Sequence, residues 1–175
     1  ACPECGGLLS LRHDAPDATG AALRARFDAR LARAVASSVA DGVGAARASG
    51  VWRFREIVLP TVDDAAIVSQ PEGNTPLYAR DAVARWAGVD ALLLKHDGHN
   101  PSASFKDRGM TVALTQARRI GARAVACAST GNTSASLAAY ASLAGIPGLV
   151  FVPAAQVALG KLAQTLGYGA RTLLV

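Results

Sequence analysis

One lysine of this chain lies where a helix is predicted to begin, after a loop of small polar residues at 100–105. Ser104 and Asp107 have the spacing of a capping box, which predicts a helix start between them. Lys106 then falls in the first turn, where the helix dipole disfavours a cation and so favours the neutral amine. Schiff-base chemistry with a carbonyl compound needs a neutral amine. A solvated lysine without a chemical role fits the same spacing.

A second polar loop, residues 128–136, follows a predicted buried strand and opens a predicted helix. Gly131 permits a tight turn, and the free N–H groups at a helix start can hold an anion. Ser129, Thr130 and Thr133 add hydroxyl groups suited to a carboxylate, and Asn132 adds an amide beside them. A serine- and threonine-rich helix cap that binds nothing would have the same pattern.

The elements around these loops alternate between strand and helix. The predicted strands are 91–95, 124–128, 149–152 and 171–175, and the predicted helices are 81–87, 106–119, 133–144 and 161–166. This alternation of apolar runs with helices predicts an α/β fold whose parallel sheet is covered on both faces. A further amphipathic helix is predicted to begin after Thr19, because Leu23, Phe27, Leu31, Val35 and Val39 recur every four residues.

Composition narrows the function classes. The chain has 175 residues, of which 51% are hydrophobic and 18% charged, which favours a globular fold over disorder. No apolar run reaches the length of a membrane span. Three cysteines are too few for a disulfide scaffold and fit a reducing, cytoplasmic setting. Residues 108–175 carry six basic residues and no acid, without the basic clusters and aromatics of nucleic-acid binders, so small phosphorylated ligands fit better.

Three segments together resemble the fold-type II pyridoxal-phosphate enzymes. Ser-Phe-Lys-Asp-Arg-Gly at 104–109 resembles their lysine motif, and Ser-Thr-Gly-Asn-Thr at 129–133 resembles their loop for the substrate carboxylate. Glu-Gly-Asn-Thr-Pro-Leu at 72–77 resembles a third segment common to the group. The resemblance implies an α/β fold of parallel sheets with flanking helices, and pyridoxal 5'-phosphate as the cofactor.

Within that group the chain is most similar to the threonine synthases. The similarity rests on residues 51–55 followed by Leu59 and Pro60, on the Asp107 that follows the lysine, and on 151–153 followed by 159–164. It implies conversion of O-phospho-L-homoserine and water to L-threonine and phosphate, by a protein that is a homodimer in its full-length form.

The resemblance also implies a role for each site residue. Lys106 would be the catalytic lysine, holding the cofactor as a Schiff base and moving the substrate's protons. Asn132 would hydrogen-bond the 3'-oxygen of the pyridine ring. Ser129, Thr130 and Thr133 would bind the substrate carboxylate.

Three family features are missing from the chain, among them the first thiol pair of the zinc ribbon. The glycine-rich cup for the cofactor phosphate and the partner of the pyridine nitrogen normally lie beyond position 175, so we expect an N-terminal half that is inactive alone. Cys2 to Gly7 resembles the second half of a zinc ribbon, and Cys2 and Cys5 supply two of the four ligands that structural zinc needs. We expect a ribbon remnant at 1–18, part of a large domain at 19–111 and an incomplete small domain at 112–175.

Alternative functions stay open at this point. A threonine or serine dehydratase shares the group, although Asp107 and the segment around Trp52 favour the synthase. A cysteine synthase is disfavoured, because its lysine motif usually has Val where this chain has Phe105. A non-catalytic remnant or binding module would make Lys106 dispensable.

Overall fold

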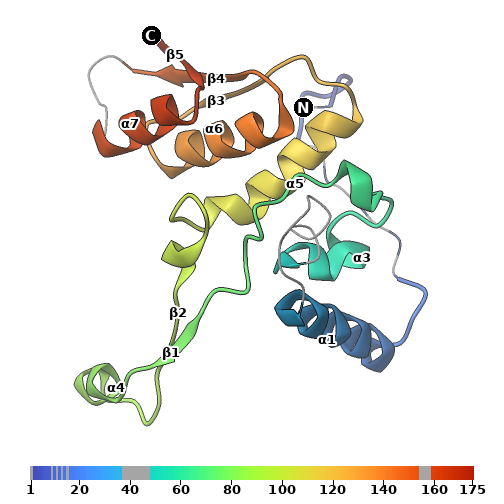
Figure 1. Ribbon diagram of the computed structural model, residues 1–175, viewed down its shortest axis with the longest axis vertical. Helices are drawn as coiled ribbons and strands as arrows, with labels where there is room; N and C mark the ends of the chain where they lie inside the picture. Colours follow the sequence, from blue (N-terminus) through green and yellow to red (C-terminus); the bar gives the residue numbers. More distant parts are fainter. Residues whose placement is uncertain are drawn as a thin grey trace.

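A three-stranded parallel sheet forms one end of the molecule in the computed structural model, which describes residues 2–8, 10, 12, 14, 16–36, 48–153 and 159–175 (Figure 1). Its strands are β3 (Val125–Ala128), β4 (Gly148–Val152) and β5 (Arg171–Leu174), in that spatial order. The parallel α/β pattern predicted for residues 124–175 is confirmed, with strand bounds shifted by about one residue.

The helices α6 (Asn132–Ala144) and α7 (Leu159–Gly167) connect these strands and lie on the same face of the sheet (Figure 1). Right-handed crossovers between strands that follow one another in sequence order place both helices on one side. Exposure accordingly alternates along β3. The prediction of helices on both faces is therefore wrong for the described part of this sheet.

Helix α5 (Lys106–Arg119) runs between the sheet layer and the rest of the chain and packs against α6 (Figure 1). The predicted helix 106–119 is confirmed. A core cluster joins Val68 to Leu114 of α5 and to Tyr140 of α6. The predicted domain boundary at 111/112 falls inside α5, and the division into domains stays a prediction.

Buried hydroxyl groups fix α5 against the preceding segment. Thr111 Oγ1 accepts a hydrogen bond from Trp52 Nε1 (2.7 Å) and donates one to the carbonyl of Val68 (2.7 Å). One turn later, Thr115 Oγ1 accepts from the N–H of Val68 (3.0 Å). Both threonines are fully buried, so they give polar backbone and indole groups partners where water is excluded.

The segment 77–95 departs from the prediction. The sequence predicts a buried strand at 91–95 of the parallel sheet, whereas β2 (Leu93–Lys95) is exposed and pairs antiparallel with β1 (Leu77–Ala79). The short helix α4 (Asp81–Ala87) lies in the connection between them, where the chain turns back on itself. Helix α4 has the predicted bounds and ends at Gly88, whose φ is +71°.

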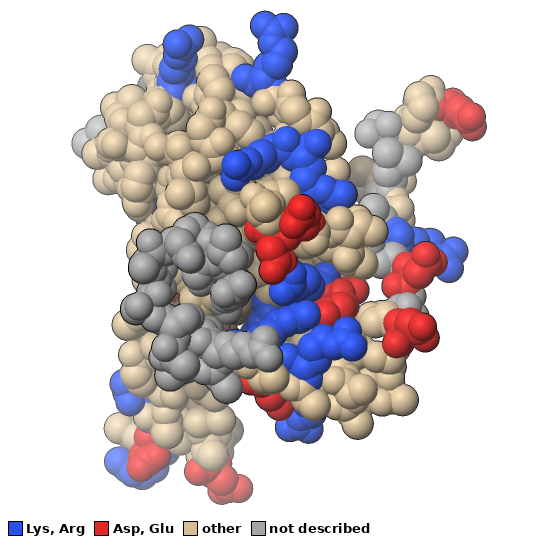
Figure 2. Space-filling view, turned by 45° about the vertical axis from the view of Figure 1, so that its right-hand side comes forward, with Lys and Arg blue, Asp and Glu red and all other residues tan. Residues whose placement is uncertain are grey.

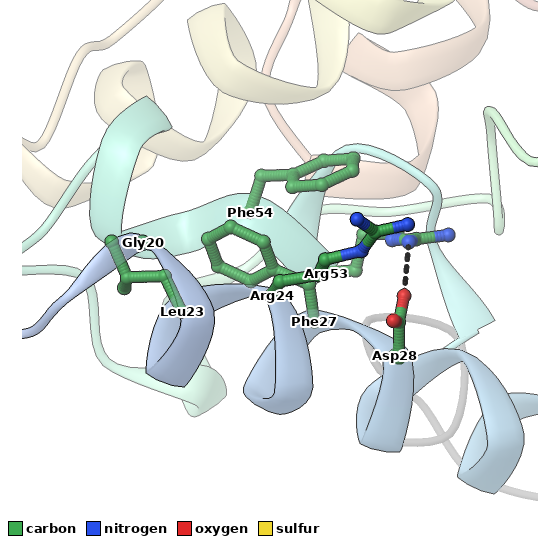
Figure 3. A pocket seen from close by; sticks show the side chains of 7 residues that line it. All are labelled: Gly20, Leu23, Arg24, Phe27, Asp28, Arg53 and Phe54. Carbon is green, nitrogen blue, oxygen red and sulfur yellow. Dashed lines mark hydrogen bonds and ion pairs between the residues drawn. The ribbon is translucent and has the colours of Figure 1, made fainter.

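Helix α1 (Gly20–Ala36) lies against the short helices η1 (Trp52–Phe54) and α3 (Arg55–Val58). Thr19 caps α1 as predicted, because its Oγ1 accepts from the N–H of Ala22. The rings of Phe27 and Phe54 meet edge to face at 4.9 Å and border an open hollow of about 440 Å³, shown in Figure 3. The predicted positions Val35 and Val39 lie outside the described side chains.

Basic and acidic side chains lie next to one another in the middle of the face in Figure 2. Ion pairs join Arg30 to Glu56 (2.5 Å) and Arg108 to Asp97 (2.7 Å). Two further short helices, η2 (Asp64–Ala66) and η3 (Asp97–His99), carry acids of such pairs. In the part of the chain that the structure describes, no helix is both long and apolar enough to cross a bilayer.

Candidate active site

Lys106 is the first residue of α5, in the turn where the sequence predicts it. Its backbone N–H donates to Ser104 Oγ (3.2 Å), which fixes the start of the helix. The side chain is half-buried, and its Nζ lies 4.8 Å from the centre of the Phe105 ring. The lysine is thus held at the backbone while its amine stays near the surface.

The predicted capping box forms only in part: Ser104 Oγ accepts from a backbone N–H of the first turn, but the carboxylate of Asp107 does not bond back to Ser104. The carboxylate of Asp107 reaches back to Ser102, accepting from its N–H (2.6 Å) and from its Oγ–H (2.5 Å). The chain folds back at Ala103, whose φ is +60°, and this turn brings Ser102 over the first turn of α5. Asp107 is fully buried, so its carboxylate needs these donors.

The second loop connects β3 to α6, and α6 begins at Asn132, one residue before the predicted start. The N–H of Gly131 donates to Ser129 Oγ (3.2 Å), and Ser134 Oγ donates to the carbonyl of Gly131 (2.7 Å). No side chain caps the start of α6. The first N–H groups of α6 are therefore left without a side-chain partner, which is the arrangement that binds anions at helix starts.

The four predicted ligand-binding residues differ in exposure. Asn132 is exposed, whereas Ser129, Thr130 and Thr133 are half-buried. The hollow beneath the loop, lined in part by Ser129 and Thr130, has no room for a water molecule. This hollow is therefore too small to hold a ligand.

A hydrogen bond across the helices brings the two loops together. Ser136 Oγ donates to Asp107 Oδ1 (2.5 Å), and both residues are fully buried. Ser136 lies one turn after Asn132, and Asp107 is the neighbour of Lys106. The structure thus places the lysine turn against the first turns of the helix that carries the second loop.

The third motif segment carries a buried carboxylate that the sequence analysis missed. Glu72 is fully buried and accepts hydrogen bonds from Ser49, from Ser69 (3.0 Å) and from the phenol of Tyr140 (2.7 Å). Burial, together with the negative charge of Glu72, raises the pKa of Tyr140. This cluster ties the segment 72–77 to α6.

Close backbone packing holds the same segment on its other side. The N–H of Gly50 donates to the carbonyl of Glu72 (2.6 Å), and a Cβ at Gly50 would lie 2.1 Å from the backbone nitrogen of Asn74. A side chain at position 50 would push the backbone at Asn74 away from the backbone at Gly50. Position 50 therefore has room only for glycine.

Arg108 forms a second polar cluster with the loop before α5. It donates to both carboxylate oxygens of Asp97 (2.7 and 3.0 Å) and to Thr75 Oγ1 (3.1 Å). The hydrogen bonds from Arg108 lower the pKa of Asp97 to about 2. The cluster links the motif segments 72–77 and 104–109, which the sequence alone did not join.

Ion pairing predicts a stability that falls in acid. Hydrogen bonds from Arg30 lower the pKa of Glu56 from 4.5 to about 2 in the folded chain. A carboxylate with a lowered folded-state pKa stabilises the fold above its unfolded pKa, and this stability is lost as the pH falls through the folded value. We expect the free energy of unfolding, measured in urea, to decrease from about pH 5 to pH 2.

The matched variants for this prediction are Glu56→Gln and Asp90→Asn, the latter at an exposed acid. Glu56→Gln should reduce the pH dependence between these limits, with the part due to Asp97 remaining, and Asp90→Asn should leave it unchanged. An unchanged slope in Glu56→Gln would show that this ion pair contributes nothing to the acid dependence.

The thiol turn lies outside both loops. The N–H of Cys2 donates to the carbonyl of Gly7 (2.8 Å), and hydrogen bonding by backbone N–H groups, first that of Cys5, lowers the pKa of Cys2. Among the described residues, no group of three or more His, Cys, Asp or Glu side chains could hold a metal ion. Cys127, in β3, is half-buried, and burial raises its pKa.

A comparison with known protein families shows to which family this chain belongs. Residues 68–175 match the family described as "Pyridoxal-phosphate dependent enzyme". The chain belongs to this family. Its matched region contains Lys106 and the whole loop 129–133, and pyridoxal phosphate is the family's cofactor.

Two threonine synthases resemble the chain beyond the matched region. It is 43% identical to the threonine synthase of Methanocaldococcus jannaschii over 172 residues, which is 98% of this chain and 38% of that protein. It is 47% identical to the threonine synthase of Synechocystis sp. over 80% of this chain and 37% of that protein. The chain thus spans just over a third of the length of these relatives.

Solved structures agree with the fold of the family. Maize serine racemase superposes with a TM-score of 0.54 over 58% of this chain and 31% of that chain, at 24% identity. A pyridoxal 5'-phosphate-dependent aspartate racemase gives a TM-score of 0.53 over 57% of this chain and 32% of that chain, at 26% identity. These likenesses support the parallel sheet with its flanking helices.

The donor set around α5 and α6 fits the family's cofactor. The amine of Lys106 suits an aldehyde carbon, and the start of α6 with its hydroxyl groups suits an anionic group. The exposed amide of Asn132 lies on the same helix start. The Asp107–Ser136 hydrogen bond holds these two parts against each other.

Proposed function

We propose that the protein containing this chain is a threonine synthase, which converts O-phospho-L-homoserine and water to L-threonine and phosphate. The observation that carries the proposal is the 43% identity over 98% of the chain to a threonine synthase. That identity includes the segment before residue 68, which the family match does not cover.

In this proposal Lys106 holds the cofactor through its amine and moves a proton at the substrate's α carbon. Bound pyridoxal phosphate supplies an electron sink for the carbon skeleton of the substrate. Asn132 donates a hydrogen bond to the ring's 3'-oxygen. Phosphate leaves the γ carbon and the oxygen of water joins the β carbon, so the atoms of substrate and water are all found in threonine and phosphate.

The loop 129–133 would orient the substrate by its carboxylate. Thr130 and Thr133 are half-buried and border the start of α6, so their hydroxyl groups could donate to a carboxylate that also meets the N–H groups there. Ser129 Oγ already accepts from Gly131, which leaves its own proton available to the ligand. A fixed carboxylate holds the α carbon at a constant place relative to Lys106.

Removing one hydroxyl group from this loop should lower the catalytic efficiency with O-phospho-L-homoserine. In the full-length protein, Thr130→Val is expected to lower kcat/KM by about 1–3 kcal/mol in transition-state free energy, because a hydrogen bond to the carboxylate is lost. Thr130→Ser keeps the hydroxyl group and should retain most of the activity. Unchanged kinetics in Thr130→Val would assign the loop another role.

The test of the function itself is to supply the full-length protein with pyridoxal phosphate and O-phospho-L-homoserine. Equal amounts of threonine and phosphate are expected. A dehydratase would instead release ammonia from threonine or serine, and a non-catalytic binding module would release neither product.

Three further statements belong to the proposal. The thiols of Cys2 and Cys5 would form half of a zinc-ribbon site, supplying two of its four ligands. A homodimer and a cytoplasmic setting stay predictions.

A further inference from the structure

Asp107, the residue after Lys106, is fully buried, and it accepts hydrogen bonds from two different elements. Ser102, in the loop before α5, donates to it twice, and Ser136 of α6 donates to it once. All three residues are fully buried. The neighbouring Arg108 is engaged with Asp97 instead. The charge of Asp107 is thus met by donors from two separate elements and by the start of α5.

The contacts of Asp107 continue into the second loop. Gln164 Nε2 of α7 donates to the carbonyl of Ser102 (3.4 Å). Thr165 Oγ1 donates to the carbonyl of Lys161 (2.8 Å) and lies 3.3 Å from Ser134 Oγ, which donates to the carbonyl of Gly131 (2.7 Å). These contacts, which are partly buried, connect the lysine turn through α7 and α6 to the turn at Gly131.

From this connection we propose that Asp107 is a positioning residue, which sets the distance between Lys106 and the loop 129–133 by holding the first turn of α5 against α6. A helix start that is bonded only to its own loop could shift along α6. The Ser136–Asp107 bond prevents such a shift, because it joins the residue beside the lysine to a point one turn after Asn132.

The hydrogen-bonding capacity of the side chain at position 107 determines which substitutions keep its bonds to Ser102 and Ser136. In Asp107→Asn the amide oxygen can accept from the N–H of Ser102, while the amide nitrogen donates to the two serine hydroxyl groups, which can also act as acceptors. Asp107→Ala removes every bond. Ser136→Ala removes only the bond between α5 and α6 and leaves both bonds from Ser102 intact.

The experiment uses the full-length protein and three readouts: the dissociation constant of pyridoxal phosphate, the KM for O-phospho-L-homoserine, and the free energy of unfolding in urea. Ser136→Ala and Asp107→Ala are expected to raise the first two by about 10-fold or more, under conditions where each variant is folded. Asp107→Asn should stay within about threefold of the unmodified protein in both.

A matched control separates positioning from stability. Ala139→Gly, at another buried position of α6, should lower the free energy of unfolding without changing either the cofactor dissociation constant or KM. The proposal is overturned if Ser136→Ala behaves like Ala139→Gly, or if Asp107→Asn is as damaging as Asp107→Ala, since the charge and not the connection would then matter.

Only the KM readout rests on the proposed function. If the unmodified protein releases no phosphate from O-phosphohomoserine, the proposed function fails, while the cofactor dissociation constants of the variants still decide the role of Asp107. If phosphate is released and those constants do not change, the positioning role fails alone. If Asp107→Ala does not fold, Ser136→Ala gives the decision.

Discussion

Lys106→Ala in the full-length protein is expected to reduce phosphate release from O-phosphohomoserine by at least about 10²–10⁴-fold, the usual contribution of a positioned acid–base group. The same variant should lose covalent capture of the cofactor, measured by borohydride reduction and peptide mapping. Both effects follow from one amine, which is half-buried at the start of α5.

The scarcity of lysine makes this experiment selective. Besides Lys106 the chain contains Lys95 and Lys161. Lys95 Nζ donates to the carbonyl of Thr75 (2.5 Å), and Lys161 Nζ donates to Gln164 Oε1 (3.1 Å). Lys161→Ala is the control and should keep the captured cofactor. Turnover of Lys106→Ala within about twofold of the unmodified protein would contradict the assignment.

The second large effect is expected for the 175 residues by themselves. With added pyridoxal phosphate they should show no measurable phosphate release, against the roughly 1–10³ per second of ordinary enzymes. They span 38% of the threonine synthase of Methanocaldococcus jannaschii, and a cofactor is held by more contacts than its lysine. A turnover number within the ordinary range would show that these residues already form a complete site.

The isolated chain should also associate with itself. Trp86 is 88% exposed, and Leu77, Leu93 and Leu174 are exposed as well. Exposed apolar side chains favour contact between molecules. Light scattering that increases with protein concentration is the expected result, and Trp86→Ser should reduce it. A concentration-independent monomer would contradict this expectation.

Local signals in the sequence predicted much of the local structure around the candidate site. Lys106 begins α5 as expected, and Gly88 and Gly145 end their helices in the left-handed conformation. Each of these features depends on residues within about one helical turn of one another. The loop 129–133 is found between strand and helix for the same reason.

The sequence did not reveal which side chains form the buried hydrogen bonds, and most of these partners lie far apart along the chain. Asp107 has two plausible local partners, Ser102 and Ser104, and the spacing favoured the wrong one. Its partner Ser136 and the pair of Glu72 with Tyr140 join different elements, so no periodicity reveals them. Strand β1 is three residues long, too short for an alternating pattern to be recognised.

The two threonines on α5 also give the lysine a fixed direction. A helix held by a single hydrogen bond can still turn about its own axis, but Thr111 and Thr115 hold α5 at two points one turn apart. A rotation of α5 about its own axis must therefore break the bond between Thr111 and Trp52. Trp52 therefore helps to fix the orientation of the helix that begins with Lys106, although it does not contact the lysine itself.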